Sequence, residues 1–155
     1  MICTRQALPV IDRNKFAAAS GLAKGAYVLA DPPDGQPELI LIGTGSEVSL
    51  CLTACEKLSA EGIKVRVVSM PSWELFERQD QNYQDSVLPP AVTARVSVEE
   101  ASPLGWDRYV GSRGIVLGMK TFGMSAPLKV VTEHFCFVAE HVVVAAKEVL
   151  SRVGW

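Results

Sequence analysis

IKVRVVSMPSWELF, residues 63–76, is the stretch that decides the fold. Its β-branched residues up to Val68 predict a buried strand. The strand ends at Met70-Pro71, because proline donates no hydrogen bond to a ladder and favours an extended residue before it. Ser72 then predicts the cap of a short helix that begins at Trp73. A strand that runs into a capped helix is typical of the carboxyl edge of an α/β sheet, where ligand crevices and partner surfaces usually lie.

The segment before this stretch predicts two strands and a helix. The strands are the apolar runs 25–30 and 38–42, separated by the turn sequence DPPDG. A connection this short predicts that the two strands are antiparallel neighbours. The sequence GTGSE that follows begins the helix, in which Thr44 and Glu47 have the spacing of a capping box. Gly62 ends the helix as a left-handed cap, so a parallel βαβ unit leads into the central stretch.

The segment after the central stretch completes the sheet and covers it. Residues 80–87 predict a short polar helix, and residues 94–98 and 115–119 predict two more strands. Two helices close the chain after Pro127, a residue suited to a first helical turn. The fold class expected is therefore α/β, a three-layer α/β/α domain. Its five-stranded sheet is mostly parallel, with one antiparallel edge strand at 25–30 and helices on both faces.

Composition places the chain among ordinary globular domains. It has 155 residues, 48% of them hydrophobic and 21% charged, which is one domain's worth of chain with enough apolar surface for a core. The net charge of −2 arises from scattered charges without a basic stripe, which argues against nucleic acid as a partner. No apolar run approaches membrane-spanning length, so no membrane contact is expected. The cysteines follow no CxxC spacing and are expected to be reduced in a cytoplasmic domain: Cys3, Cys51, Cys55 and Cys136.

The GTGS turn at the start of the first long helix carries an alternative interpretation. Free backbone N–H groups at a helix start can hold an anion, and the residues concerned are Gly43, Thr44, Gly45 and Ser46. A dinucleotide fingerprint would need a small residue at position 48, which is Val48. Glu47 also puts a negative charge where an anion would sit. A tight turn is therefore the first interpretation. A stand-alone α/β module that binds a small anion or nucleotide at 43–47 is the alternative.

Other polar residues predict no catalytic or metal site. Glu99 and Glu100 are adjacent, so on a strand they would point to opposite faces and share no proton. One of them is expected to pair with Arg108 or to hold the loop that follows. His134 and His141 have no ligand cluster between them, and they are expected to be ordinary helix-end or interface histidines.

Four aromatic residues gather where the predicted strands end. They are Trp73, Phe76, Trp106 and Tyr109, all in loops or helix starts at the carboxyl edge. Aromatic side chains in such places either cap the core or build an interface with another domain or subunit. Both roles stay open at this point.

Several motifs together resemble the C-terminal domain of transketolases. They occur in the family's order and spacing, as VRVVSMPSWELFE (65–77), LPPAVTARVSVE (88–99), GWDRYVG (105–111) and FGMSAP (122–127). Transketolases are three-domain thiamine-diphosphate enzymes that transfer a two-carbon ketol unit between sugar phosphates. They act in the pentose phosphate pathway and, in photosynthetic organisms, the Calvin cycle. The resemblance implies that residues 1–25 are a connector from an upstream pyrimidine-binding domain and that residues 26–155 are the C-terminal domain.

The resemblance also implies what this chain lacks. The GDG motif that holds the diphosphate and the metal is missing from the sequence, as is the glutamate that activates the cofactor. Thiamine diphosphate and Mg²⁺ (or Ca²⁺) would therefore bind to other domains, and the isolated chain would be structural and inactive. Its partners would be the upstream domains and a second subunit of a homodimer. Arg5 would hold the terminal phosphate of the sugar in the full enzyme, since a guanidinium suits a phosphate. Cys136 stands where the family often has glycine, and it is interpreted as loop variation.

Overall fold

The computed structural model describes residues 6–155, so Arg5 and the phosphate contact predicted for it lie outside the described residues. A five-stranded sheet forms the middle layer in the order β1-β3-β2-β4-β5. The strands are β1 (Tyr27–Ala30), β2 (Leu39–Gly43), β3 (Val65–Ser69), β4 (Arg95–Glu99) and β5 (Ile115–Gly118). β1 runs antiparallel to β3 at one edge, and all the other pairs are parallel. The predicted fold class is confirmed.

The neighbour of β1 differs from the prediction. β1 pairs with β3, through Tyr27 and Ser69 among others, and not with β2. The connection 31–38 permits this, because at about 3.3 Å per residue it easily spans the ~10 Å between alternate strands. β2 is buried along its whole length. A strand in that position needs a hydrogen-bonded neighbour on each side, and β3 and β4 are those neighbours, both parallel to it.

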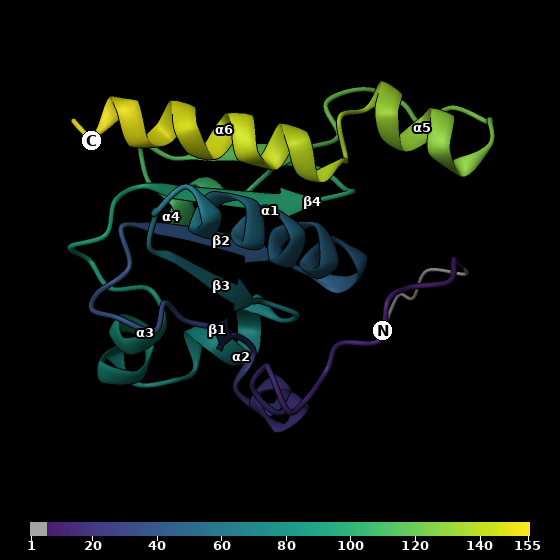
Figure 1. Cartoon of the computed structure of the whole chain (residues 1–155). Helices are drawn as coiled ribbons and strands as arrows, with labels where there is room; N and C mark the ends of the chain where they lie inside the picture. Colours follow the sequence, from purple (N-terminus) through teal and green to yellow (C-terminus); the bar gives the residue numbers. More distant parts are fainter. Residues whose placement is uncertain (1–5) are drawn as a thin grey trace.

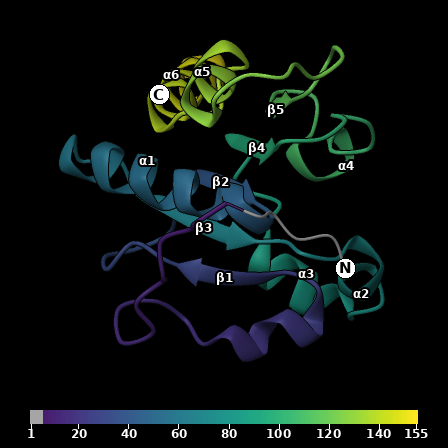
Figure 2. The same ribbon diagram turned by 90° about the vertical axis from the view of Figure 1, so that its right-hand side faces the viewer.

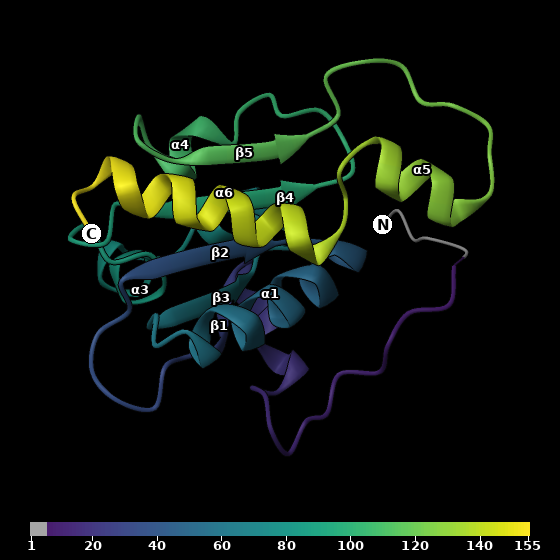
Figure 3. The same ribbon diagram turned by 45° about the horizontal axis from the view of Figure 1, so that its top comes forward.

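Helices cover both faces of the sheet, as Figure 2 shows with the sheet between them. On one face lie α1 (Val48–Ala60) and α6 (Ala139–Arg152), which pack side by side (Figure 3). On the other face lie α2 (Trp73–Glu77), α3 (Gln81–Val87) and α4 (Asp107–Val110). Two apolar cores result, one on each side of the sheet. The short 3₁₀ helices η1 (Ala19–Lys24) and η2 (Gly45–Glu47) precede β1 and α1.

Helix α5 (Leu128–His134) lies apart from these layers. Figure 1 shows it beyond the carboxyl ends of the strands, and Figure 3 shows the long loop that joins it to β5. None of its residues is buried. The described residues that precede η1, from residue 6 on, also run along this side of the molecule (Figure 1). In the described part of the chain, no helix is long and apolar enough to cross a membrane.

Local hydrogen bonds confirm one predicted cap and correct another. Ser72 caps α2, with its Oγ accepting a hydrogen bond from the backbone N–H of Leu75. The capping box predicted between Thr44 and Glu47 is wrong, because the Thr44 side chain caps nothing. The Glu47 carboxylate instead accepts hydrogen bonds from the hydroxyl of Ser46 and from the backbone N–H of Glu100. The Glu47 carboxylate therefore binds the backbone of Glu100, which is distant in the sequence, and does not cap the start of the helix.

Candidate functional site at the carboxyl edge

A small crevice opens where the parallel strands end. Its volume is about 180 Å³, and it is lined by Thr44, Met70, Pro71, Ser72, Trp73, Glu74, Glu99 and Trp106. Thr44 follows β2, and Glu99 is the last residue of β4. The chain leaves β2 for β3 on one side and then crosses to β4 on the other. The crevice therefore lies at the topological switch point, the usual place for a ligand or partner in an open α/β sheet.

Glu99 is the charged group at the mouth of β4. Its carboxylate makes no hydrogen bond or ion pair within residues 6–155. Burial raises its pKa to about 7, and the neighbouring carboxylates of Glu47 and Glu100 add to the rise. Neither role predicted for Glu99 or Glu100 is observed among the described residues: Arg108 pairs with Glu77 at 2.8 Å, and neither glutamate carboxylate makes a hydrogen bond to the loop. Glu99 is thus an acid without a partner at a switch point.

Glu47 is the residue of this site whose role the sequence analysis predicts wrongly. Its side chain is only 3% exposed, and burial raises its pKa. Its carboxylate holds the start of the loop after β4, since it accepts a hydrogen bond from the Glu100 N–H at 3.3 Å. Burial and the Glu47 charge also raise the pKa of Glu100. The sequence did contain a signal, an acid placed directly before the apolar face of a helix, but it was assigned to capping.

The aromatic residues at this edge divide into two kinds. Phe76, Trp106 and Tyr109 are buried in the core between the sheet and the short helices, so the core-capping role holds for these three. Trp73 is half-buried and lines the crevice. Its ring meets that of Trp106 edge to face, with centroids 5.1 Å apart. Of the four, Trp73 is therefore the one whose side chain can reach a partner.

The residues predicted for the alternative anion site do not suit an anion. Gly43 ends β2, and the turn η2 follows it. The buried Glu47 carboxylate lies at that turn, and Glu99 faces the same crevice. Negative charges so close would repel a phosphate, so these residues do not fit a nucleotide or the diphosphate of thiamine diphosphate. Across residues 6–155, no group of three or more His, Cys, Asp or Glu side chains could hold a metal ion.

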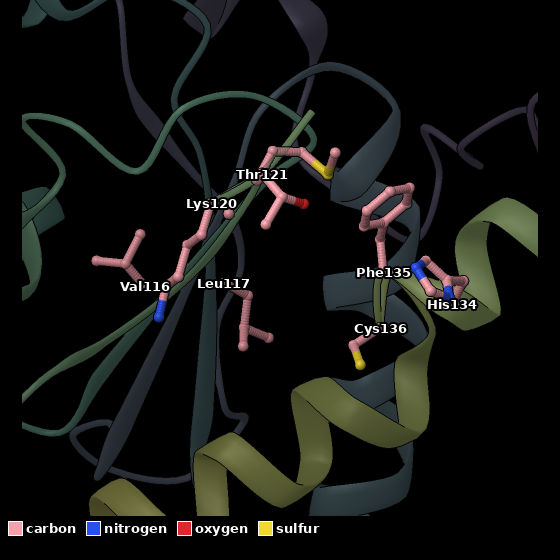
Figure 4. A pocket seen from close by; sticks show the side chains of 9 residues that line it. Val116, Leu117, Lys120, Thr121, His134, Phe135 and Cys136 are labelled. Atoms are coloured by element: carbon pink, nitrogen blue, oxygen red, sulfur yellow. The ribbon is translucent and has the colours of Figure 1, made fainter. Parts of the chain in front are cut away.

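A second hollow, of about 280 Å³, lies between the end of β5 and the turn from α5 to α6 (Figure 4). Leu117 and Thr121 face it from β5 and the residues after it, and Phe135 faces it from the other wall, whereas the Lys120 side chain points away from it (Figure 4). His134 stacks edge to face on Phe135 at 4.8 Å. Cys136 has φ of +67°, the left-handed region that favours glycine. The conformation at Cys136 is therefore one that glycine would adopt at lower cost.

A larger hollow, of about 400 Å³, lies over the second core, beside Phe76, Leu88 and Pro90. Its main polar groups are already satisfied. Glu77 accepts hydrogen bonds from Arg108 and from the Tyr109 hydroxyl, both at 2.8 Å. The Arg108 hydrogen bond is the main cause of the lowered pKa of Glu77. This wall is an internal network that holds α2 to α4.

The two cysteines of α1 are in surroundings that keep their thiols protonated. Cys51, Cys55 and Cys136 are free thiols. Cys51 is completely buried, and burial raises its pKa far above the ordinary value. Burial also raises the pKa of Cys55. These thiols belong to the packing of α1 and of the turn before α6.

Comparisons with known proteins agree with the motifs. The sequence profile of the transketolase-like TK C-terminal domain matches residues 25–138. The transketolase of a Nostoc species is 51% identical over 148 residues, which cover 96% of this chain and 22% of that protein. Transketolase 1 of Escherichia coli is 52% identical over 150 residues, covering 97% of this chain and 22% of that protein.

Solved structures give the same result. A transketolase from Leishmania mexicana superposes with a TM-score of 0.80 at 40% identity, covering 88% of this chain and 19% of that one. An R525L mutant of the Pichia stipitis transketolase gives a TM-score of 0.85 at 32% identity, covering 97% of this chain and 21% of that one. This chain thus spans about a fifth of the length of the proteins that it matches.

Proposed function

This chain belongs to the transketolase family, in which it corresponds to the C-terminal domain, and we propose that it acts as the assembly domain of a transketolase. In this role it packs on the domains that precede it and contributes to the contacts of a homodimer. The whole enzyme transfers a two-carbon ketol unit between sugar phosphates in the pentose phosphate pathway, in the cytoplasm. Thiamine diphosphate and Mg²⁺ (or Ca²⁺) bind to the other domains.

The observation that carries this proposal is a set of exposed apolar side chains near the carboxyl edge. Phe122 is 98% exposed and Leu104 is 82% exposed. Met124, Leu128 and Val130 are also exposed, in the loop before α5 and in α5 itself. Apolar side chains gathered in this way usually mark a protein–protein contact. The relatives are several times longer than this chain, which makes a preceding domain the natural occupant of the surface.

The chemistry of the chain supports an assembly role rather than a catalytic one. Its crevice is lined by carboxylates that would repel a diphosphate. Catalytic groups are therefore assigned to the other domains, and the isolated chain has no catalytic residue in this proposal. Arg5 has one role in the whole enzyme, the binding of the substrate's terminal phosphate through its guanidinium. The alternative of a free-standing anion-binding module is not favoured.

A reconstitution experiment tests the assembly role. The Escherichia coli relative would be produced without the part that matches this chain, and the two pieces would be mixed. We expect a complex in light scattering, and ketol transfer in the presence of thiamine diphosphate and Mg²⁺ that neither piece shows alone. Failure of the wild-type pieces to associate would contradict the proposal.

A pair of variants locates the contact surface. The double substitution Leu104→Asp with Phe122→Asp should weaken the complex at least about tenfold, because each places a charge in an apolar contact. The control is Val144→Asp, an exposed valine on α6, the helix that covers the sheet face. It should leave binding unchanged. Equal weakening by the control would assign the contact to a different face of the molecule.

A further inference from the structure

The crevice carries carboxylates that are not paired with a positively charged side chain among the described residues. Glu99 and Glu74 line it, and Glu47 and Glu100 lie beside it. The structure pairs none of these four carboxylates with a lysine or arginine among the described residues. Arg108 lies 5.3 Å from the centre of the Trp73 ring, but its guanidinium is already paired with Glu77. A cation is therefore the group that this crevice lacks.

The size of the crevice limits what the cation can be. Its volume of about 180 Å³ lies below the roughly 300–1,000 Å³ that is usual for small-molecule sites. A single ammonium or guanidinium group fits a space of this size. Trp73 adds an aromatic ring to the wall, and such rings attract cations. A metal ion is a poor match, since residues 6–155 hold no group of three or more suitable ligands.

The surroundings point to a protein as the source of the cation. Leu104, in the loop that leads from Glu99 to Trp106, is 82% exposed. An exposed apolar side chain close in sequence to a half-buried carboxylate suits a protein contact, and arginine is enriched at the centres of such contacts. A side chain delivered from a docked domain would lose little entropy on reaching Glu99, because the docking already positions it.

We propose that the crevice at the ends of β2 and β4 receives a lysine or arginine side chain from the preceding domain, which pairs with Glu99 against the ring of Trp73. This inference rests on the proposed assembly function and names the contact at its centre. Glu99 is then an anchor of the domain interface and takes no part in ketol transfer.

The first test uses the chain alone, with ethylguanidinium as a probe for the side chain. Carboxyl NMR would follow the titration of Glu99, and tryptophan fluorescence would follow Trp73. At equal ionic strength, the probe should lower the titration midpoint of Glu99 by about one pH unit relative to sodium. The fluorescence response should be lost in Glu99→Gln and retained in Glu100→Gln, which removes the same charge one residue away. A Glu99 midpoint that does not respond to the probe would overturn the inference.

The second test uses the reconstituted pair. Glu99→Gln should weaken the complex at least about tenfold, and Glu100→Gln less than about threefold, because a buried interfacial ion pair is costly to break. Wild-type binding that Glu99→Gln leaves unchanged would overturn the inference and leave the assembly function standing. Absence of any wild-type complex would overturn both the assembly function and the proposed source of the cation.

Discussion

Charged side chains have hydrogen-bonding partners at the amino ends of the strands, whereas a charged side chain at the carboxyl ends has none among the described residues. Near the amino ends of the strands, Arg66 makes two hydrogen bonds of 2.7 Å to Asp31 and two more to the carbonyl groups of Ser86 and Val87. Arg95 donates to four backbone carbonyl groups, those of Leu88, Pro89, Val92 and Tyr109. At the carboxyl ends, Glu99 has no such partner within the described residues.

This difference separates structural charges from functional ones. A buried charge is costly unless it is paired and hydrogen-bonded. At the amino ends the chain meets that requirement by itself, so these arginines hold the fold together. At the carboxyl ends this requirement is not met, because Glu99 has no hydrogen-bonding or ion-pair partner among the described residues. We infer that the carboxyl edge is completed by another domain.

Arg95→Met should have the largest effect. It removes donors from four backbone carbonyl groups and should lower the free energy of unfolding by about 4 kcal/mol, because buried acceptors would lose their partners. Urea denaturation measures this change. Arg113→Met, at an exposed position, is the control and should change stability by less than about 0.5 kcal/mol. A loss below about 1 kcal/mol for Arg95→Met would mean that the amino edge does not depend on this network.

Asp31→Asn should have the next largest effect. It leaves Arg66, which is 7% exposed, without its counter-ion. The amide oxygen can still accept one hydrogen bond, so the expected loss is about 1–2 kcal/mol, again from urea denaturation. Asp34→Asn, in the exposed part of the same turn, is the matched control. Equal losses in the two variants would point to the turn, and not to the ion pair, as the cause.

Glu99→Gln should act in the opposite direction and depend on pH. The folded pKa of about 7 lies above the ordinary 4.5, so folding favours the protonated acid. The stability that this proton contributes is fully present below about pH 4.5 and is lost as pH rises through about 7. Near pH 8 the uncharged glutamine should therefore stabilise the isolated chain, by about 1 kcal/mol after allowance for solvent screening.

Urea midpoints measured across this pH range check the prediction for Glu99. The wild-type chain should lose stability between about pH 5 and pH 8, and Glu99→Gln should lose less. Glu100→Gln serves as the control for removing a neighbouring charge. Parallel pH profiles for the wild type and Glu99→Gln would show that Glu99 is not the titrating group at the carboxyl edge.

Ser72→Ala should have the smallest effect. The Ser72 hydroxyl caps α2 by accepting a hydrogen bond from the Leu75 N–H. Loss of such a cap should cost about 0.5–1 kcal/mol. Thermal unfolding monitored by circular dichroism checks it, with Ser125→Ala in the exposed loop as the control. If Ser72→Ala and its control unfold at the same temperature, the Ser72 cap does not stabilise the start of α2.

Local patterns account for the parts of the structure that were predicted correctly. The strand that ends at Pro71, the cap at Ser72 and the left-handed Gly62 all depend on residues a few positions apart. The same holds for the positions of the five strands, which were predicted to within a few residues. The switch-point crevice was also foreseeable in outline, because a parallel sheet places its site at the carboxyl edge.

The errors concern residues that are far apart in the sequence. β1 was assigned to β2 because the two are close along the chain, whereas β3 supplies the observed partner. Glu47 was assigned to a local cap, whereas its acceptor role is used by Glu100, 53 residues away. The predicted pairing of a glutamate with Arg108 failed because α2 brings Glu77 to that arginine first.

By itself, the sequence determined the helices and strands, the α/β class and the resemblance to the transketolase C-terminal domain. Periodicity, caps and motifs each depend on residues that are close together in the sequence. The tertiary structure alone decided the order of the strands, the burial of three of the four aromatic residues and the isolation of Glu99. The physical reason is that pairing, burial and the balance of charge depend on which distant segments meet, and only the packed chain brings those segments together.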